Sequence, residues 1–120
     1  MPFNYLLTNL LVDVPEAVGA IFLDDEGEAV EWVTRHNDPF DLKVEGAYHS
    51  IFVRRLTTIS AENQFGKLKQ YIIKGEALTA LTHPLPDGYY LLLVMDQPGH
   101  LGKATFHLEN TAEVLAKELA

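Results

Sequence analysis

The sequence contains no cysteine, and none of its apolar runs approaches the length of a membrane span. The missing cysteine excludes disulfide bonds, thiolate nucleophiles and zinc sites built on cysteine. A membrane-spanning helix needs about 20 consecutive apolar residues. The first residues also lack a basic segment and a small-residue cleavage site, so they are not predicted to form a signal peptide. We therefore expect a cytoplasmic protein that does not insert into membranes.

Basic residues are scarce in the first half of the chain. Residues 1–53 contain ten acidic and two basic residues, residues 54–120 contain seven of each, and the net charge is -8. A basic band lies within the second half: Arg54, Arg55, Lys67, Lys69 and Lys74. An acidic protein repels phosphate groups, so nucleic acid is not an expected partner.

Length and residue patterning predict one domain over residues 1–120. Helices are expected at 3–14, at 39–61 and from about 101 to 119, and strands at 17–23, 28–35, 67–74, 77–85 and 89–95. Asp38 is the expected N-cap of the middle helix, and Pro39 its first residue. Residues 17–23 and 89–95 are apolar on both faces, which is typical of central strands covered on both sides. The fold class is therefore α/β (α+β): one five-stranded, mostly antiparallel sheet between helices, in the order α-β-β-α-β-β-β-α.

The middle helix carries more apolar surface than one sheet face requires. One apolar line consists of Phe40, Val44, Ala47, Tyr48 and Ile51, flanked by Phe52 and Ile59, and we expect it to cover the sheet. A second line consists of Leu42, Gly46, His49, Val53, Leu56 and Ser60. A helix that is apolar nearly all round is buried nearly all round. We expect the second line to pack on a partner, although another layer of the same chain could also cover it.

Catalytic and metal-binding patterns fail on specific positions. Neither His100 nor His107 has a histidine or acid at the i+4 spacing of a helical metal site. His49 follows Glu45 by one turn, which predicts a local ion pair. The sequence has no P-loop and no G-x-S-x-G elbow. We expect no catalytic residue, no metal, no cofactor and no enzymatic activity.

The acidic run FLDDEGE, residues 22–28, is the strongest candidate for an ion site. In a calcium loop starting at Asp24, the sixth residue would be Ala29 instead of glycine and the twelfth would be Arg35. An aspartyl phosphate at Asp24 would need a lysine and further acids at other strand ends, but Asp96 stands alone there. The run is better interpreted as a hairpin turn in which Gly27 takes a positive φ.

The order of these segments resembles that of the roadblock family, named for a dynein light chain and including bacterial gliding-motility regulators. The resemblance is carried by VPEAVGAIFLD (14–24), an acidic turn ending in Gly27, a long middle helix, LPDGYYL (85–91), and GHLGKA (99–104) at the start of the last helix. It implies a profilin-like sandwich that pairs through its third strand and its middle helix. It also implies a non-enzymatic regulatory or scaffold domain that binds a small Ras-like GTPase or a larger complex.

The resemblance and the surplus helix line together give two sets of candidate residues. The dimer interface, in a homodimer or in a heterodimer with a paralogue, would contain Leu42, His49, Val53, Leu56, Lys69, Tyr71 and Ile73. The partner-binding surface for the GTPase would contain Lys43, Ser50, Arg54 and Thr57. The alternative is a small-molecule sensor of the profilin/PAS-like type, with a pocket lined by Trp32, Tyr48, Phe52, Tyr89 and Tyr90.

Overall fold

A computed structural model describes residues 3–35, 40–96 and 100–119. Its elements follow the predicted order: α1 (Asn4–Asp13), β1 (Ala17–Leu23), β2 (Ala29–Thr34), α2 (Phe40–Glu62), β3 (Tyr71–Lys74), β4 (Thr79–Pro84), the short 3-10 helix η1 (Pro86–Gly88), β5 (Tyr90–Met95) and α3 (Leu101–Leu119). The predicted N-cap Asp38 and first helical residue Pro39 lie outside the described residues. The fold class is confirmed.

The five strands form one antiparallel sheet in the order β2-β1-β5-β4-β3. β1 and β5 are central and almost entirely buried, as the apolar pattern of residues 17–23 and 89–95 predicts. β3 lies at one edge and hydrogen-bonds to β4. The predicted strand 67–74 is too long, because only its last four residues pair in the sheet.

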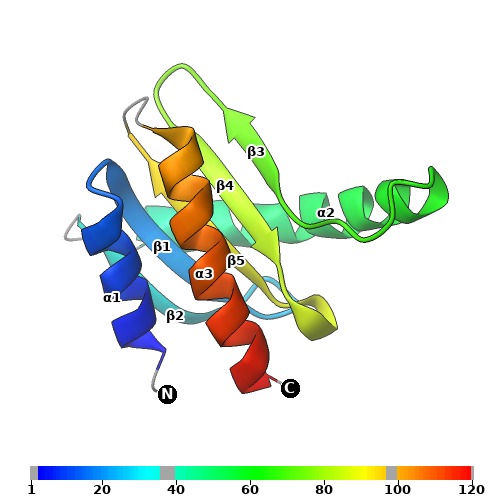
Figure 1. The fold of residues 1–120 in the computed structure, drawn as a ribbon, viewed down its shortest axis with the longest axis horizontal. Helices are drawn as coiled ribbons and strands as arrows, with labels where there is room; N and C mark the ends of the chain where they lie inside the picture. Colours follow the sequence, from blue (N-terminus) through cyan, green and yellow to red (C-terminus); the bar gives the residue numbers. More distant parts are fainter. Residues whose placement is uncertain (1–2, 36–39, 97–99, 120) are drawn as a thin grey trace.

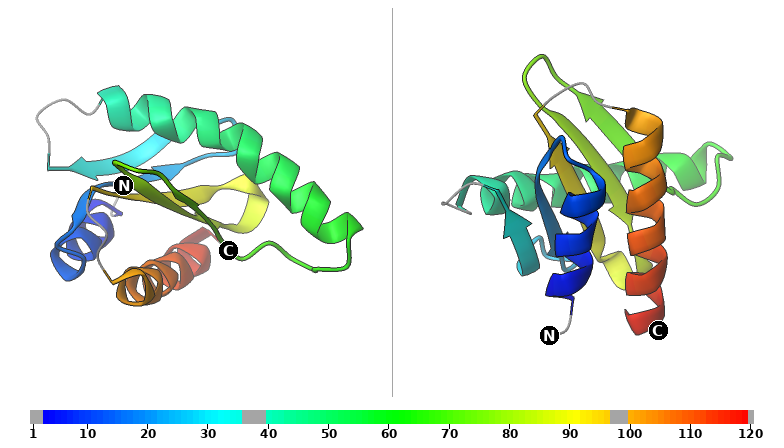
Figure 2. Two further views of the ribbon diagram at one scale, coloured as in Figure 1. Left: turned by 90° about the horizontal axis from the view of Figure 1, so that it is seen from above. Right: turned by 60° about the vertical axis from the view of Figure 1, so that its left-hand side comes forward.

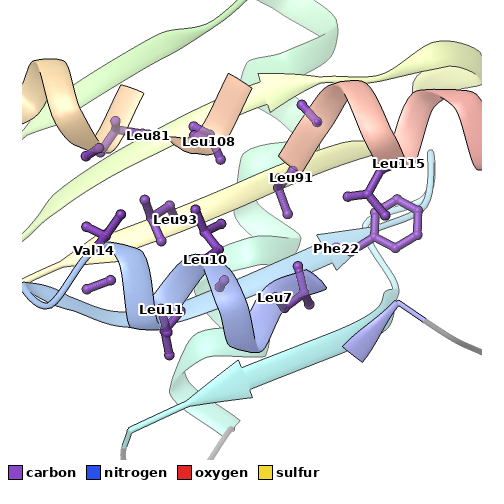
Figure 3. Packing of buried hydrophobic residues seen from close by; sticks show 14 of the residues in the cluster. Leu7, Leu10, Leu11, Val14, Phe22, Leu81, Leu91, Leu93, Leu108 and Leu115 are labelled. Carbon is purple, nitrogen blue, oxygen red and sulfur yellow. The ribbon is translucent and has the colours of Figure 1, made fainter. Parts of the chain in front are cut away.

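The sheet separates two helical layers (Figures 1 and 2). α1 and α3 lie side by side on one face, and α2 crosses the other. Under α1 and α3 lies the larger apolar cluster, which includes Leu7, Leu10, Phe22, Leu93 and Leu108 (Figure 3). Its helical members recur at the i, i+3/i+4 spacing of the α1 and α3 sequences, which puts them on one face of each helix. Among the described residues, no helix combines the length and hydrophobicity that a membrane span requires.

α2 rests on the sheet with the face that was predicted to point outward. Leu42, His49 and Val53 are buried against the sheet, at 9%, 1% and 6% exposure. Tyr48 and Ile51, which were predicted to cover the sheet, are 63% and 49% exposed. The assignment of the two helix lines was therefore wrong.

The physical reason is the close approach of α2 to β1. A Cβ at Gly46 would lie 2.8 Å from Leu23 Cδ2, so any larger residue would require the buried Leu23 side chain to shift. The hydroxyl of buried Tyr90 also donates to the Gly46 carbonyl over 2.7 Å. A small residue and a hydrogen-bonded histidine thus suit the sheet side of α2 better than the bulkier apolar line does.

The run FLDDEGE forms the end of β1 and the turn into β2. The Asp24 carboxylate accepts hydrogen bonds from the backbone N–H groups of Glu26 and Glu28, both at 2.9 Å. Gly27 has φ 83°, a conformation that side chains other than glycine rarely adopt. The carboxylate of Asp24 therefore caps the turn, and the predicted hairpin is confirmed.

Candidate protein-binding surfaces

An apolar stripe remains exposed on the outer side of α2. It consists of Val44, Tyr48, Ile51, Phe52 and Ile59, which are between 37% and 63% exposed. We call these five residues the α2 stripe. Single exposed apolar residues are normal on a protein surface, whereas a large exposed apolar patch often marks an interaction site. The spacing of these side chains places them along one side of a single helix, where exposed Arg55 separates Phe52 from Ile59.

The α2 stripe continues toward the free edge of the sheet. Phe52 packs edge-on against His49, with ring centroids 5.3 Å apart, and His49 stacks on Tyr71 of β3 at 5.8 Å. Beside Tyr71, Ile72 and Ile73 are 40% and 44% exposed. An edge strand with exposed apolar side chains and unpaired backbone groups can pair with another strand. The α2 stripe and the β3 edge are therefore neighbouring parts of one surface.

A buried hydrogen-bond network holds β3 to α2. His49 Nε2 lies 3.1 Å from a carboxylate oxygen of Glu45, which can only accept, so this nitrogen donates. In the neutral ring Nδ1 then accepts, and it lies 2.5 Å from the Tyr71 hydroxyl and 3.3 Å from that of Thr82. Burial raises the pKa of Tyr71 to about 12; the Thr82 hydrogen bond lowers it, and the Glu45 charge raises it. The tyrosine therefore stays protonated at neutral pH, and its hydroxyl donates to His49 Nδ1 when the imidazole is neutral.

The last turns of α2 extend past the sheet, and the following segment returns to β3 (Figure 1). A hollow of about 400 Å³ lies between them, lined among others by Leu56, Ile59, Phe65 and Tyr71. Phe65 is 80% exposed. Gln70 Oε1 is buried, and no group of the described chain donates a hydrogen bond to it. This part of the molecule therefore exposes apolar surface and leaves a buried acceptor unsatisfied.

The predicted partner-binding residues divide into two pairs. Lys43 places its ammonium 3.6 Å from the centre of the Trp32 ring, and Ser50 is buried and donates to the Ala47 carbonyl. Arg54 and Thr57 are exposed. Exposure therefore leaves Arg54 and Thr57 available to a partner, whereas Lys43 and Ser50 bind within the chain.

Ser50, Arg54 and Thr57 line one groove of about 480 Å³ with Asp25 and Asp87. The two aspartates come from turns that touch, because a Cβ at Gly88 would lie 2.7 Å from the Asp25 Cβ. Asp87 has φ 61°, a left-handed conformation that aspartate tolerates better than most residues. The groove thus combines a guanidinium group with two carboxylates that are distant in the sequence. We call it the α2 groove.

The predicted dimer-interface residues also separate. Leu42, His49 and Val53 are buried against the sheet, so they do not form an exposed interface. Leu56 is half-buried in the hollow behind α2, together with exposed Lys69. Tyr71 and Ile73 lie on the edge strand β3.

The exposed apolar residues of α2 that the sequence pattern placed against the sheet are Val44, Tyr48, Ile51, Phe52 and Ile59. Their apolar spacing was visible in the sequence, but it was assigned to the wrong side of the helix.

The five aromatic residues proposed to line a sensor pocket do not converge. Tyr48 and Phe52 are exposed. Tyr89 and Tyr90 are adjacent in the chain and point to opposite faces of the sheet, as neighbouring strand residues do. Tyr89 stacks on Phe22 under α1 and α3, whereas Tyr90 bonds to α2. The structure therefore contradicts that pocket. Among the described residues, no group of three or more histidines and acids is arranged to hold a metal ion.

No protein-family model matches the sequence, and no curated protein matches it significantly. Solved structures do match. A roadblock/LC7 domain from Streptomyces avermitilis superposes with a TM-score of 0.86 at 14% identity, covering 97% of this chain and 96% of that one. MglB of Myxococcus xanthus superposes with a TM-score of 0.86 at 13% identity, covering 98% of this chain and 94% of that one. The gliding protein MglB from Thermus thermophilus superposes with a TM-score of 0.85 at 19% identity, covering 98% of this chain and 90% of that one.

These superpositions extend over nearly the whole of each chain. Together with the element order and the antiparallel sheet, they show that the chain has the roadblock fold. At such low identity the likeness concerns the fold alone. Function must therefore be argued from the exposed surfaces.

Proposed function

We propose that this protein is a non-enzymatic, dimeric regulatory or scaffold domain that binds a small Ras-like GTPase or a larger complex. The observation that carries the proposal is the α2 stripe beside the free edge of β3, on a roadblock fold. The proposal treats residues 1–120 as one domain in the cytoplasm, where a cysteine-free chain is at home.

In the proposed dimer, β3 pairs with β3 of a second copy and the two α2 helices lie side by side. A two-fold axis brings the same patch of both copies together, so each apolar residue of the α2 stripe meets apolar surface. Edge pairing would also satisfy the backbone groups of β3. Stable interfaces bury about 1,200–2,000 Å² in total, which a strand edge and a long helix can supply together. A paralogue with the same surface would serve as an alternative partner.

Sedimentation at micromolar concentration tests this dimer. We expect the unmodified chain to sediment as a dimer and Tyr48→Glu to sediment as a monomer, because the new carboxylate would be buried in the interface. Tyr5→Glu is the matched control, since Tyr5 is 58% exposed on α1, on the other face of the sheet. A monomeric unmodified chain, or equal dimerisation of both variants, would contradict the proposal.

We place GTPase binding at the α2 groove, with Arg54 and Thr57 as contact residues. Pull-down of small Ras-like GTPases loaded with GDP or with a non-hydrolysable GTP analogue tests this. Arg54→Glu should reduce capture about tenfold or more, because it reverses a charge in the contact surface. Lys117→Glu makes the same charge change on α3 and should bind normally. If both variants capture the GTPase equally, the α2 groove is not the contact site.

A further inference from the structure

A second groove lies on the α3 side of the sheet, opposite α2. It runs between the C-terminal half of α3, the end of β4 and the segment before β3, and has a volume of about 350 Å³. We call it the α3 groove. It lies where the segment 67–69 passes beside α3 and the end of β4 before the chain enters β3. Neither proposed surface on the α2 side includes it.

The floor of the α3 groove is apolar. Its accessible part consists of half-buried Leu68, Pro84, Pro86 and Ala116, and the two prolines have no N–H donor. Leu85 and Ala112 lie beneath them and belong to the core. Ala116 is small and half-buried, so a partner side chain can approach α3 closely there. Such a floor suits apolar side chains of a peptide.

The two rims of the α3 groove carry opposite charges. Lys67 and Lys69 stand on one side, and Glu109 and Glu113 on the other. All four side chains are exposed. Among the described residues, the close contacts between basic and acidic side chains are His49–Glu45 and His107–Asp13, so these lysines and glutamates do not pair with each other. The charges on both rims are therefore available to an occupant.

We propose that the α3 groove docks an amphipathic helix of a partner protein, with one acidic flank and one basic flank. The apolar ridge of the helix lies on Leu68, Pro84 and Ala116. Its acidic flank faces the lysine rim and its basic flank faces the glutamate rim. Glu109 and Glu113 are four residues apart, which is about 6 Å along a helix, so basic residues at the same spacing in the partner match them.

A displayed library of 18-residue helical peptides tests the charge pattern. Every peptide carries the same leucine ridge, and each flank position is either Lys or Glu. Selection on the unmodified protein should enrich peptides with one acidic and one basic flank. Selection on the folded variant Lys67→Glu/Lys69→Glu should instead enrich peptides with two basic flanks. A pool without flank preference, or an unchanged preference in the variant, overturns the proposal.

Binding of one selected peptide then tests the location. Ala116→Trp should weaken it about tenfold or more by filling the α3 groove, whereas Val114→Trp, on the exposed side of α3, should not. Tyr48→Glu should leave peptide binding unchanged, which separates this test from that of the proposed dimer. If Ala116→Trp alters only the oligomeric state, the occupant is a second copy and the proposal is wrong.

Discussion

The two faces of the sheet are covered in different ways. Under α1 and α3, the contact consists of close-packed leucines with Phe3 and Phe22, which meet edge-on at 5.5 Å between ring centroids. Under α2, the cluster is smaller and depends on Gly46, on the Tyr90 hydroxyl and on the His49 network. The outer side of α2 keeps its apolar stripe exposed. We infer that the first face mainly stabilises the fold, whereas the second mainly fixes the position of α2 on the sheet.

Truncating a buried leucine on the sheet side of α3 should show the largest difference between the faces. Leu108→Ala should lower the free energy of unfolding by about 2–5 kcal/mol, since Leu108 is 0% exposed. Val53→Ala, on the sheet side of α2, should lower the free energy of unfolding by about 1–2 kcal/mol, because it removes fewer groups from a smaller cluster. Urea unfolding of both variants, followed by circular dichroism, measures this. Equal losses would mean that the two faces stabilise the fold equally.

A methyl group at Gly46 tests the close approach of α2. It would meet Leu23 Cδ2 at 2.8 Å, so Gly46→Ala should destabilise by about 1–3 kcal/mol despite the better helix propensity of alanine. Gly102→Ala on α3 is the matched control, since a Cβ there would meet no atom within 4 Å, and it should be neutral or slightly stabilising. Thermal unfolding compares them. A stable Gly46→Ala variant would show that α2 can move away from the sheet at little cost.

The His49 network predicts a loss of stability in alkali. The pKa of Tyr71 is raised to about 12 from its ordinary 10.0, so the folded state holds this proton more tightly than the unfolded state. The resulting stability is complete below pH 10 and is lost as the pH rises toward 12. Because Tyr71 is only half-buried, we expect a loss on the order of 1 kcal/mol or less near pH 11.

Tyr71→Phe should remove this part of the alkaline loss and cost about 0.5–1.5 kcal/mol at neutral pH. Tyr5→Phe, at an exposed tyrosine, is the control. Denaturant unfolding at pH 8 and in steps toward pH 11 gives both quantities. An identical pH profile for the two variants would remove Tyr71 from the explanation.

The smallest effect is expected on the α2 stripe. Ile59 is 49% exposed, so Ile59→Ser should change the stability of the monomer by less than about 0.5 kcal/mol. If the chain pairs through this surface, the variant should nevertheless melt earlier than the unmodified chain at high protein concentration, because association stabilises the folded state. Melting curves over a hundredfold dilution measure the difference. A difference that is independent of concentration would argue against an interface at Ile59.

Hydrophobic periodicity was enough to predict the fold class and most boundaries. The all-apolar segments 17–23 and 89–95 became the central strands, and the turn at Gly27 followed from its residue types. Periodicity could not choose between the two lines of α2, since both are apolar. Which line faces the sheet depends on how closely Gly46 approaches Leu23 and on the hydrogen-bond partners that the sheet offers to His49. Both are tertiary contacts that the local sequence does not encode.

The α2 groove and the α3 groove could not be predicted from the sequence for a similar reason, because each is lined by segments that are distant in the chain. The α2 groove unites Asp25, Arg54 and Asp87, and only the sheet order brings these positions together. The sequence did identify Arg54 and Thr57 as exposed positions, because a polar arc on an otherwise apolar helix is visible in the local sequence. The over-long strand at residues 67–74 reflects alternating lysines that resemble a strand pattern, whereas pairing with β4 begins only at Tyr71.

The position of β5 has a consequence for synthesis of the chain. β5 lies between β1 and β4, so it joins the hairpin β1–β2 to the hairpin β3–β4. Until β5 has left the ribosome, the nascent chain can form only two separate hairpins, each with an apolar inner edge that has no neighbour. Such edges pair readily with other chains. A product that stops before residue 90 should therefore aggregate or be degraded, however well its first helix and hairpin form.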